Sequence, residues 1–296
     1  MALHIAADND AVVTVDEFVD HVQAHVDLYD IDSIAAAGQM FRGLANDPEL
    51  VVRQLNRMVD EQFRKAAIGS TQSIYLGGGR DFYLRANVWP SAADIAGGRI
   101  YQDQFSYNSA HDHNYHFMTV GYHGPGYQTD LYEYDRSQVQ GHVGEHVDLR
   151  FVERSHLKTG MVTLYRAGRD VHTQLPPDDL SLTLNFMIST PDVRVRDQYF
   201  FDLANSTLAD YPGGVDATVR VSILKIAAYV GDENTQQLLH DLAADHPCRR
   251  TRLGAYEALA AMRPEDAADT WTRAYTDSEE LIQRAARERL RAALSE

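Results

Sequence analysis

The sequence contains almost nothing that would cross-link the chain or hold it in a membrane. Its 296 residues include a single cysteine, Cys248, so no internal disulfide can form and nothing requires an oxidising compartment. No apolar run approaches the roughly 20 residues that span a bilayer. Residues 1–10 lack the basic start and apolar stretch of a signal peptide. These absences predict a soluble, cytoplasmic protein.

Basic charge is also scarce, since 27 Lys and Arg residues stand against 43 Asp and Glu residues and the net charge is −16. A chain this acidic is not expected to bind the phosphate backbone of a nucleic acid or a membrane surface. The sequence has no Gly-x-Ser-x-Gly elbow, no Walker loop and no Rossmann glycine fingerprint. The Gly77-Gly78-Gly79-Arg80 run lacks the Lys-Ser/Thr of a phosphate loop, and we interpret it as a turn.

The first part of the chain is predicted to be helical. Residues 13–68 carry apolar side chains at helical spacing, and Thr14 followed by Glu17 fits a capping box. Asp47 followed by Pro48 indicates the start of another helix. We therefore assign residues 1–70 to N-terminal helices that pack on the segment that follows.

From about residue 72 to residue 201, β-branched and aromatic runs alternate with Gly, Pro, Asn and Asp, as strands require. Gly124-Pro125-Gly126 is typical of a hairpin turn. About eight antiparallel strands at this spacing predict a jelly roll or barrel over residues 71–205. The candidate strands are 73–76, 81–88, 104–108, 116–122, 128–134, 148–153, 160–165 and 181–189, with 197–202 as an addition.

Residues 216–296 are rich in Ala and Leu and contain an internal repeat of 32 residues. Val219–Ser222, Thr251–Gly254 and Gln283–Ala286 stand in register, each with Arg at its second position. Two helical hairpins and a last single helix resemble HEAT-like repeats. So few repeats barely bury a core, so we expect them to pack on the barrel or on a partner, with a homodimer through the helices as one form.

Histidines concentrate in the strand-rich segment, where eight of the 13 fall between His111 and His172. Residues i and i+2 of a strand share a face, so His111 and His113 can both point inward, and His172 from another strand would complete a set of three. Neutral imidazole suits Fe, Zn, Cu and Ni. His116 and His123 are competing ligands, although His116 should face outward on a regular strand.

The strand-rich segment resembles the cupin superfamily. Its first motif, His-x-His followed by Glu, is matched by His111 and His113, and its second motif by Gly160, Gly168 and His172. Arg takes the place of the second motif's Pro, and one extra residue precedes the His. The family's fold implies an antiparallel β-barrel. The chain is thus predicted to be α+β, with N-terminal helices, a cupin-like jelly-roll barrel and a HEAT-like repeat domain.

One departure from the cupin motif narrows the resemblance. Phe117 and Met118 occupy the place of the acidic ligand, which is similar to the three-histidine cupins and, among them, to thiol dioxygenases such as cysteine dioxygenase. Those enzymes carry a Tyr some way after the third His, where this chain has Ser189. The resemblance implies a mononuclear Fe(II) site, but the missing Tyr leaves the oxidation of a thiol open.

Arg85 is the candidate anchor for a substrate carboxylate, because thiol dioxygenases place an Arg on a strand at a similar offset before His-x-His. Guanidinium binds carboxylate bidentately. Arg166 and Arg169 are alternative anchors. Tyr165, next to the second motif, is the candidate catalytic residue, since its hydroxyl could donate to bound oxygen or substrate; the alternative is a purely structural core Tyr.

Together these features predict an Fe(II)-dependent oxygenase that acts on O₂ and a small, amino-acid-like carboxylate substrate. Zn would instead favour Lewis-acid or hydrolytic chemistry, and Ni, Cu or Mn remain open. A 2-oxoglutarate oxygenase is disfavoured because the position two after His111 is His113 and not a carboxylate. The alternative from another class is a non-catalytic cupin scaffold or regulatory protein whose helical repeats bind a protein partner.

Overall fold

The computed structural model of the protein describes residues 2–62, 64, 70–98, 100–101 and 104–294. The chain divides into two compact units. The first unit consists of residues 1–135 and 148–191, and the second of residues 136–147 and 192–296. Residues 192–205, assigned from sequence to the strand-rich segment, thus belong to the second unit. Among the described residues, no helix is both long and apolar enough to span a membrane.

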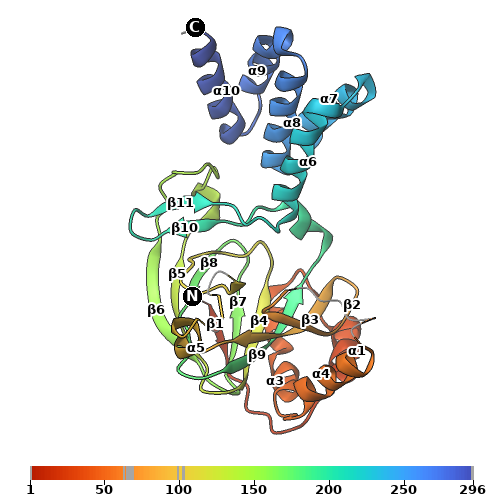
Figure 1. The fold of residues 1–296 in the computed structure, drawn as a ribbon, viewed down its shortest axis with the longest axis vertical. Coiled ribbons are helices and arrows are strands. Elements are labelled where there is room, and N and C mark those ends of the chain that lie inside the picture. Colours follow the sequence, from red (N-terminus) through yellow and green to blue (C-terminus); the bar gives the residue numbers. More distant parts are fainter. Residues whose placement is uncertain (1, 63, 65–69, 99, 102–103, 295–296) are drawn as a thin grey trace. The chain divides into compact units, whose positions relative to one another are not determined.

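The first unit combines short N-terminal helices with two antiparallel sheets (Figure 1). One sheet has six strands in the order β1-β7-β4-β9-β3-β2, and the other has three in the order β6-β5-β8. The helices are α1 Val15–His25, α2 Ile31–Ala36, α3 Gly38–Leu44, α4 Leu50–Asp60 and α5 Ala92–Ala96. The strands are β1 Leu3–Ile5, β2 Ser73–Gly79, β3 Phe82–Trp89, β4 Phe117–His123, β5 Tyr127–Glu133, β6 Arg150–Leu157, β7 Val162–Tyr165, β8 Asp170–Gln174 and β9 Ser181–Ile188.

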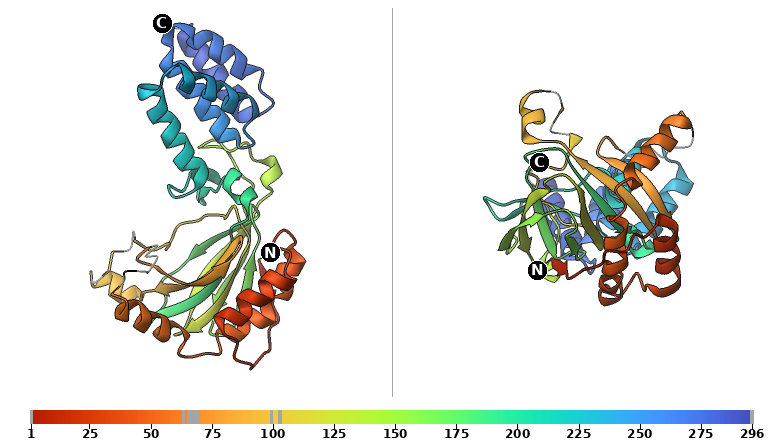
Figure 2. Two further views of the ribbon diagram at one scale, coloured as in Figure 1. Left: turned by 90° about the vertical axis from the view of Figure 1, so that its right-hand side faces the viewer. Right: turned by 90° about the horizontal axis from the view of Figure 1, so that it is seen from below.

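The predicted capping box at the start of α1 is confirmed: Thr14 accepts from the Glu17 backbone N–H, and the Glu17 side chain accepts from the Thr14 N–H. The described part of the predicted helical stretch 13–68 contains α1–α4, with Asp30 capping α2 through its side chain, and residues 63 and 65–68 lie outside the described residues. Figure 2 shows these helices together on one side of the larger sheet. Phe18 and Phe41 of the helices pack against Phe186 of β9 there.

Alternation along the strands gives the six-stranded sheet two different faces. Leu184 and Phe186 of β9 point to the helices, and together with Met118 of β4 they belong to one large apolar core. Asn185 and Met187 point the other way, toward the three-stranded sheet. The site described below lies on this inner side, between the two sheets.

The strand-rich segment is an antiparallel sandwich in the described residues, where no ladder joins the two sheets into a closed barrel. The Gly124–Gly126 turn does not close a hairpin, because β4 and β5 belong to different sheets and the turn carries the chain between them. Gly124 has a φ of +82°, and a Cβ there would lie 2.2 Å from the Leu180 carbonyl oxygen. This position therefore requires glycine.

Two further differences from the predicted strands concern the edges of the sandwich. The candidate strand 104–108 is wrong: in the described residues it is a turn in which Tyr107 makes one isolated bridge with Gln174. Its aromatic side chains serve packing instead, since Tyr107 lies 5.6 Å from Trp89 between ring centroids. Strand β1, which the sequence analysis did not identify, pairs with β7 at the sheet edge.

The second unit contains a strand pair followed by five helices, in which α8 packs against each of the other four. Its core includes Leu239, Leu259, Trp271 and Ile282. The loop 136–147 belongs to this unit through its bonds to β11, including Gly144 N–H to the Leu208 oxygen at 2.8 Å. The elements are β10 Phe200–Asp202, β11 Thr207–Asp210, α6 Asp216–Val230, α7 Glu233–Asp245, α8 Arg249–Met262, α9 Ala267–Tyr275 and α10 Glu280–Ala293.

Candidate metal centre

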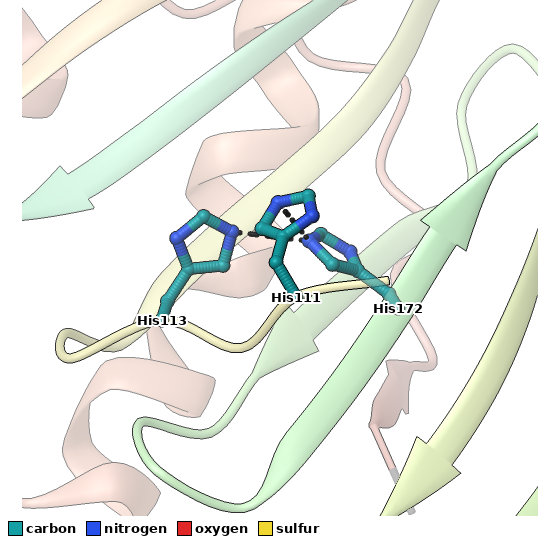
Figure 3. A group of neighbouring side chains, drawn as sticks. All are labelled: His111, His113 and His172. Atoms are coloured by element: carbon teal, nitrogen blue, oxygen red, sulfur yellow. Dashed lines mark hydrogen bonds between the residues drawn. The ribbon is translucent and has the colours of Figure 1, made fainter. Parts of the chain in front are cut away.

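Three histidine side chains from two segments converge between the sheets (Figure 3). His111 and His113 lie in the extended segment before β4, and His172 lies in the middle of β8. Two backbone hydrogen bonds join His111 to His172 and fix the two segments side by side. The three residues can each offer one ring nitrogen to a shared point, with all of these atoms within 4.8 Å of one another.

The spacing of these nitrogens fits a single divalent ion. His172 Nε2 lies 3.0 Å from His113 Nε2 and 3.1 Å from His111 Nε2. Two imidazole nitrogens bound about 2.1 Å from one ion at a right angle are about 3.0 Å apart. These two spacings match those of ligands to one ion, so the three described side chains form a candidate three-histidine site.

The protonation state of the site also suits a metal. Burial lowers the pKa of His111, and it lowers the pKa of His113 and His172 well below the usual range. The neighbouring imidazoles lower the pKa of His113 and His172 further, because a second positive charge close by is unfavourable. At neutral pH all three rings are therefore neutral, the form that binds metals.

The tautomer of His111 is fixed by the backbone. Its Nδ1 lies 2.8 Å from the Ser109 carbonyl oxygen, which can only accept a hydrogen bond. Nδ1 therefore carries the proton, and Nε2, which faces the other two rings, holds the lone pair. Metal-binding histidines are commonly oriented in this way by a carbonyl group.

Gln174 stands in the same relation to His172, two residues along β8. As placed, its Nε2 lies 3.1 Å from His172 Nδ1, while its Oε1 is buried and has no partner among the described residues. A half-turn of the amide exchanges these atoms, gives Oε1 a partner and lets His172 Nδ1–H donate to it. Sequence reasoning missed Gln174, although the His-x-Gln spacing places both side chains on one face of a strand.

Apolar rings surround the three histidines. The centroid of the Phe117 ring lies 4.7 Å from that of His113, and Phe117 stacks on Tyr165 with centroids 4.6 Å apart. Phe117 thus stands beside the site where the cupin motif has its acidic ligand. Asp112 offers no substitute, because it is fully buried and accepts a 2.6 Å hydrogen bond from the Tyr134 hydroxyl.

The two competing ligands lie outside the group. His116 Nδ1 accepts from the Ala167 backbone N–H at 3.0 Å, which commits this nitrogen to the turn before β8. His123 is exposed at the end of β4. Neither is among the residues that can share an ion with His172.

Arg85 lies on the inner face of the larger sheet, near the metal group. Its charge helps to lower the pKa of His113, after the larger effects of burial and of the two other imidazoles. Its Nε atom is buried without a partner, and no described residue forms a hydrogen bond or ion pair with its guanidinium group. Among the described residues, no carboxylate neutralises this positive charge.

The other predicted site residues have different surroundings. Arg166 forms ion pairs with Asp170 and Glu133, so its guanidinium is already bound by two carboxylates. Arg169 is exposed and its nearest Glu133 oxygen is 4.0 Å away. Tyr165 is buried, with its ring centroid 4.7 Å from that of His172, and burial raises its pKa well above the usual range.

Comparison with known proteins supports the interpretation of the C-terminal helices as HEAT repeats. The family model for HEAT repeats matches residues 213–291, which include the helices of the second unit. No curated protein sequence matches the chain.

Solved structures with some likeness include three enzymes. A hydroquinone 1,2-dioxygenase from Sphingomonas sp. TTNP3 is 12% identical, over 43% of this chain and 71% of that one, with a TM-score of 0.29. The DMSP lyase DddQ from Ruegeria pomeroyi DSS-3 is 10% identical over 72% and 84%, with a TM-score of 0.26. A Pseudomonas putida prolyl-4-hydroxylase is 13% identical over 58% and 96%, with a TM-score of 0.27.

A further match, to a structure of DMSP lyases, spans half the length of that chain, at 12% identity and a TM-score of 0.25. Scores this low establish no common fold, so the functional argument rests on the residues of the site.

Proposed function

We propose that the first unit is a cupin-type, mononuclear non-haem iron oxygenase that acts on a small carboxylate-bearing substrate. The observation that carries the proposal is a group of three neutral histidines, two buried and one half-buried, close to a guanidinium that has no partner among the described residues. A divalent metal held by three neutral imidazoles supplies Lewis-acid chemistry when bound and, if it is iron, redox chemistry with O₂. Because all three candidate ligands are neutral imidazoles, they would leave the full charge of a divalent ion in place.

Arg85 would bind the substrate's carboxylate. Its guanidinium has no anion in the described residues, and the interior has a low dielectric constant, so an entering carboxylate gains a strong and directional partner. The same pairing fixes one end of the substrate and leaves the rest of the molecule facing the histidines. This positioning role would account for a guanidinium that has no carboxylate partner among the described residues.

Phe117 and Tyr165 would exclude water from the reacting region, because both are buried and their stacked rings lie against the histidines. The raised pKa of Tyr165 keeps its phenol protonated at neutral pH. Its hydroxyl can therefore donate a hydrogen bond to substrate or to oxygen, but it cannot act as a phenolate base.

The metal assignment is tested by measuring metal in protein purified without oxygen. His172→Ala should lower bound iron to a small fraction of the wild-type amount, while His123→Ala, which removes an exposed histidine outside the group, should not. Equal metal in the His172→Ala protein would show that the ion binds elsewhere. O₂ consumption with a panel of amino, hydroxy and simple carboxylic acids then tests the reaction.

The carboxylate anchor is tested with Arg85→Gln. The expected result is a large rise in KM with unchanged metal content, because removing one partner of a buried charge pair costs about 2–5 kcal/mol. Arg169→Gln is the matched control, since it removes an exposed guanidinium near the same sandwich. Equal KM values for Arg85→Gln and wild type would remove Arg85 from this role.

A second candidate function, protein binding through the helical repeats, is favoured by exposed apolar side chains on α6. Ile223, Ile226 and Tyr229 are 58%, 61% and 87% exposed. Their spacing places them along neighbouring faces of one helix, and exposed apolar patches often mark interfaces. We propose a homodimer through these helices. Light scattering should give a dimer mass for wild type and a monomer mass for Ile223→Ser/Tyr229→Ser; a monomeric wild type contradicts it.

A further inference from the structure

A row of polar side chains crosses the inner face of the six-stranded sheet. Arg85 of β3 pairs in register with Asn185 of β9, which pairs with Thr119 of β4, and Thr119 pairs with Thr163 of β7. Directly opposed residues of antiparallel strands point to the same face. The neighbouring residues along these strands point into the helix-covered core, so all four side chains face the other sheet.

The opposite sheet contributes to the same level. Thr129 of β5 pairs in register with Gln174 of β8. This pair lies two residues along the strands from the pair of Leu131 and His172. Gln174 connects this level to the metal site, because its side-chain amide lies 3.1 Å from His172 Nδ1. The polar layer, defined as Arg85, Asn185, Thr119, Thr163, Thr129 and Gln174, therefore borders the three histidines.

Apolar side chains lie on the histidine side of the polar layer, where Phe117, Leu131 and Met187 form one buried cluster. On the other side, the next paired residues of the larger sheet are Asn87 and Thr183. Buried polar groups are costly unless they are hydrogen-bonded.

Several of these groups have no partner in the part of the chain that the structure describes. Arg85 Nε and Thr119 Oγ1 are buried without a hydrogen bond among the described residues. Asn185 is 3% exposed, and no hydrogen bond of its side chain is found in the described part of the chain. Thr163 differs, because its hydroxyl lies 3.2 Å from His4 Nδ1. The free groups thus gather around Arg85 and the metal site.

We propose that the polar layer is a substrate subsite that recognises a carboxylate together with a hydroxyl or amino group on the adjacent carbon. This inference rests on the proposed function and specifies its substrate class. Arg85 binds the carboxylate, and Asn185 and Thr119, on the next two strands, bind the second substituent. An amide and a hydroxyl can each donate and accept, so they match a group that does both.

The selectivity follows from the cost of leaving the layer unsatisfied. A carboxylate without the second substituent would satisfy Arg85 but leave Asn185 and Thr119 unpaired. Sites built to hydrogen-bond a substrate group reject analogues that lack it more strongly than apolar sites reject an extra group. We therefore expect 2-hydroxy or 2-amino acids to bind better than the corresponding simple acids.

The test compares 2-hydroxybutyrate with butyrate by isothermal titration calorimetry on the full chain loaded with Zn(II), which has no redox chemistry of its own. Wild type should bind the hydroxy acid about tenfold more tightly, the effect of one net hydrogen bond. Asn185→Leu and Thr119→Val are close in shape to the native residues and should each reduce this preference to about threefold or less.

The matched control is Thr173→Val. The Thr173 hydroxyl is also buried without a partner, but it lies between His172 and Gln174 on β8 and so faces away from the layer. This variant should keep the wild-type preference. Metal content and the circular dichroism spectrum identify any variant that fails to fold. If either Asn185→Leu or Thr119→Val fails to fold, the test is made with the other.

Equal binding of the two acids by wild type would overturn the inference. A preference that persists undiminished in both Asn185→Leu and Thr119→Val would also overturn it, because the hydroxyl would then bind elsewhere, for example to the ion. Since binding is measured without turnover, selective binding by a protein that consumes no O₂ would leave the subsite standing and remove the proposed oxygenase reaction.

Discussion

Lowering the pH from 7.5 to 5 is expected to destabilise the metal-free first unit, because His111, His113 and His172 are held there in neutral form. Each has a pKa below its usual value, first because burial disfavours the charged ring. Below about pH 6.5 the unfolded chain binds protons at these rings and the folded chain does not. Stability is therefore complete above that pH and falls as the pH is lowered.

The size of the effect follows from the pH interval. A group that is protonated only in the unfolded state costs about 1.4 kcal/mol per pH unit, so each ring that stays neutral at pH 5 costs about 2 kcal/mol. His172, which is 2% exposed and has its pKa lowered well below the usual range, should contribute fully. Two such rings give about 4 kcal/mol, a large part of the stability of a typical domain.

The measurement is urea unfolding at several pH values in a Trp271→Phe background. Trp271 lies in the second unit, so the remaining Trp89 reports on the first. A His113→Leu/His172→Leu protein in the same background should lose most of the pH dependence between 7 and 5. If its stability falls as steeply as that of the protein with all three histidines, the rings are not the cause.

Three further predictions concern single residues. Gln174→Leu should weaken metal affinity by about 10- to 100-fold in a competition titration, because His172 Nδ1–H loses its acceptor, and Gln174→Glu should largely retain it. Tyr134→Phe should lower the free energy of unfolding by about 1.5–3 kcal/mol, since the buried Asp112 loses a 2.6 Å hydrogen bond; an unchanged midpoint would contradict this. Gly124→Ala should destabilise the first unit by more than 1 kcal/mol in the same assay, whereas Gly98→Ala, with open space around it, should cost less.

Much of the fold could be predicted from local pattern. The capping box at Thr14, the strand texture and the 32-residue repeat each depend on residues close in sequence, and each corresponds to elements in the structure. Short pieces escaped prediction because their conformation is set by distant partners. Strand β1 has three residues and gains its hydrogen bonds only from β7. The segment 104–108 has the composition of a strand, but its aromatic residues pack on Trp89 instead.

The site divides in the same way. The His-x-His pattern and the distant His172 are visible in sequence because their residue type is rare and chemically specific. Asn185 and Gln174 could not be identified from sequence, because single amides are common in strands. Only the strand pairing shows that Asn185 lies beside Arg85, and only the structure shows that Gln174 contacts His172. Sequence equally could not show that Arg166 is bound by Asp170 while Arg85 has no ion pair with any described residue, because ion pairing is a property of the fold.

The path of the chain between the two units has a consequence for modularity. The backbone passes from one unit to the other three times, because the loop 136–147 leaves the sandwich between β5 and β6 and joins the second unit. Within that unit Val147 N–H donates to the Ser206 oxygen at 2.8 Å. A truncation near residue 191 would remove Ser206 and Leu208, the backbone hydrogen-bond partners of this loop. The second unit is therefore not joined to the first through a single point of the chain.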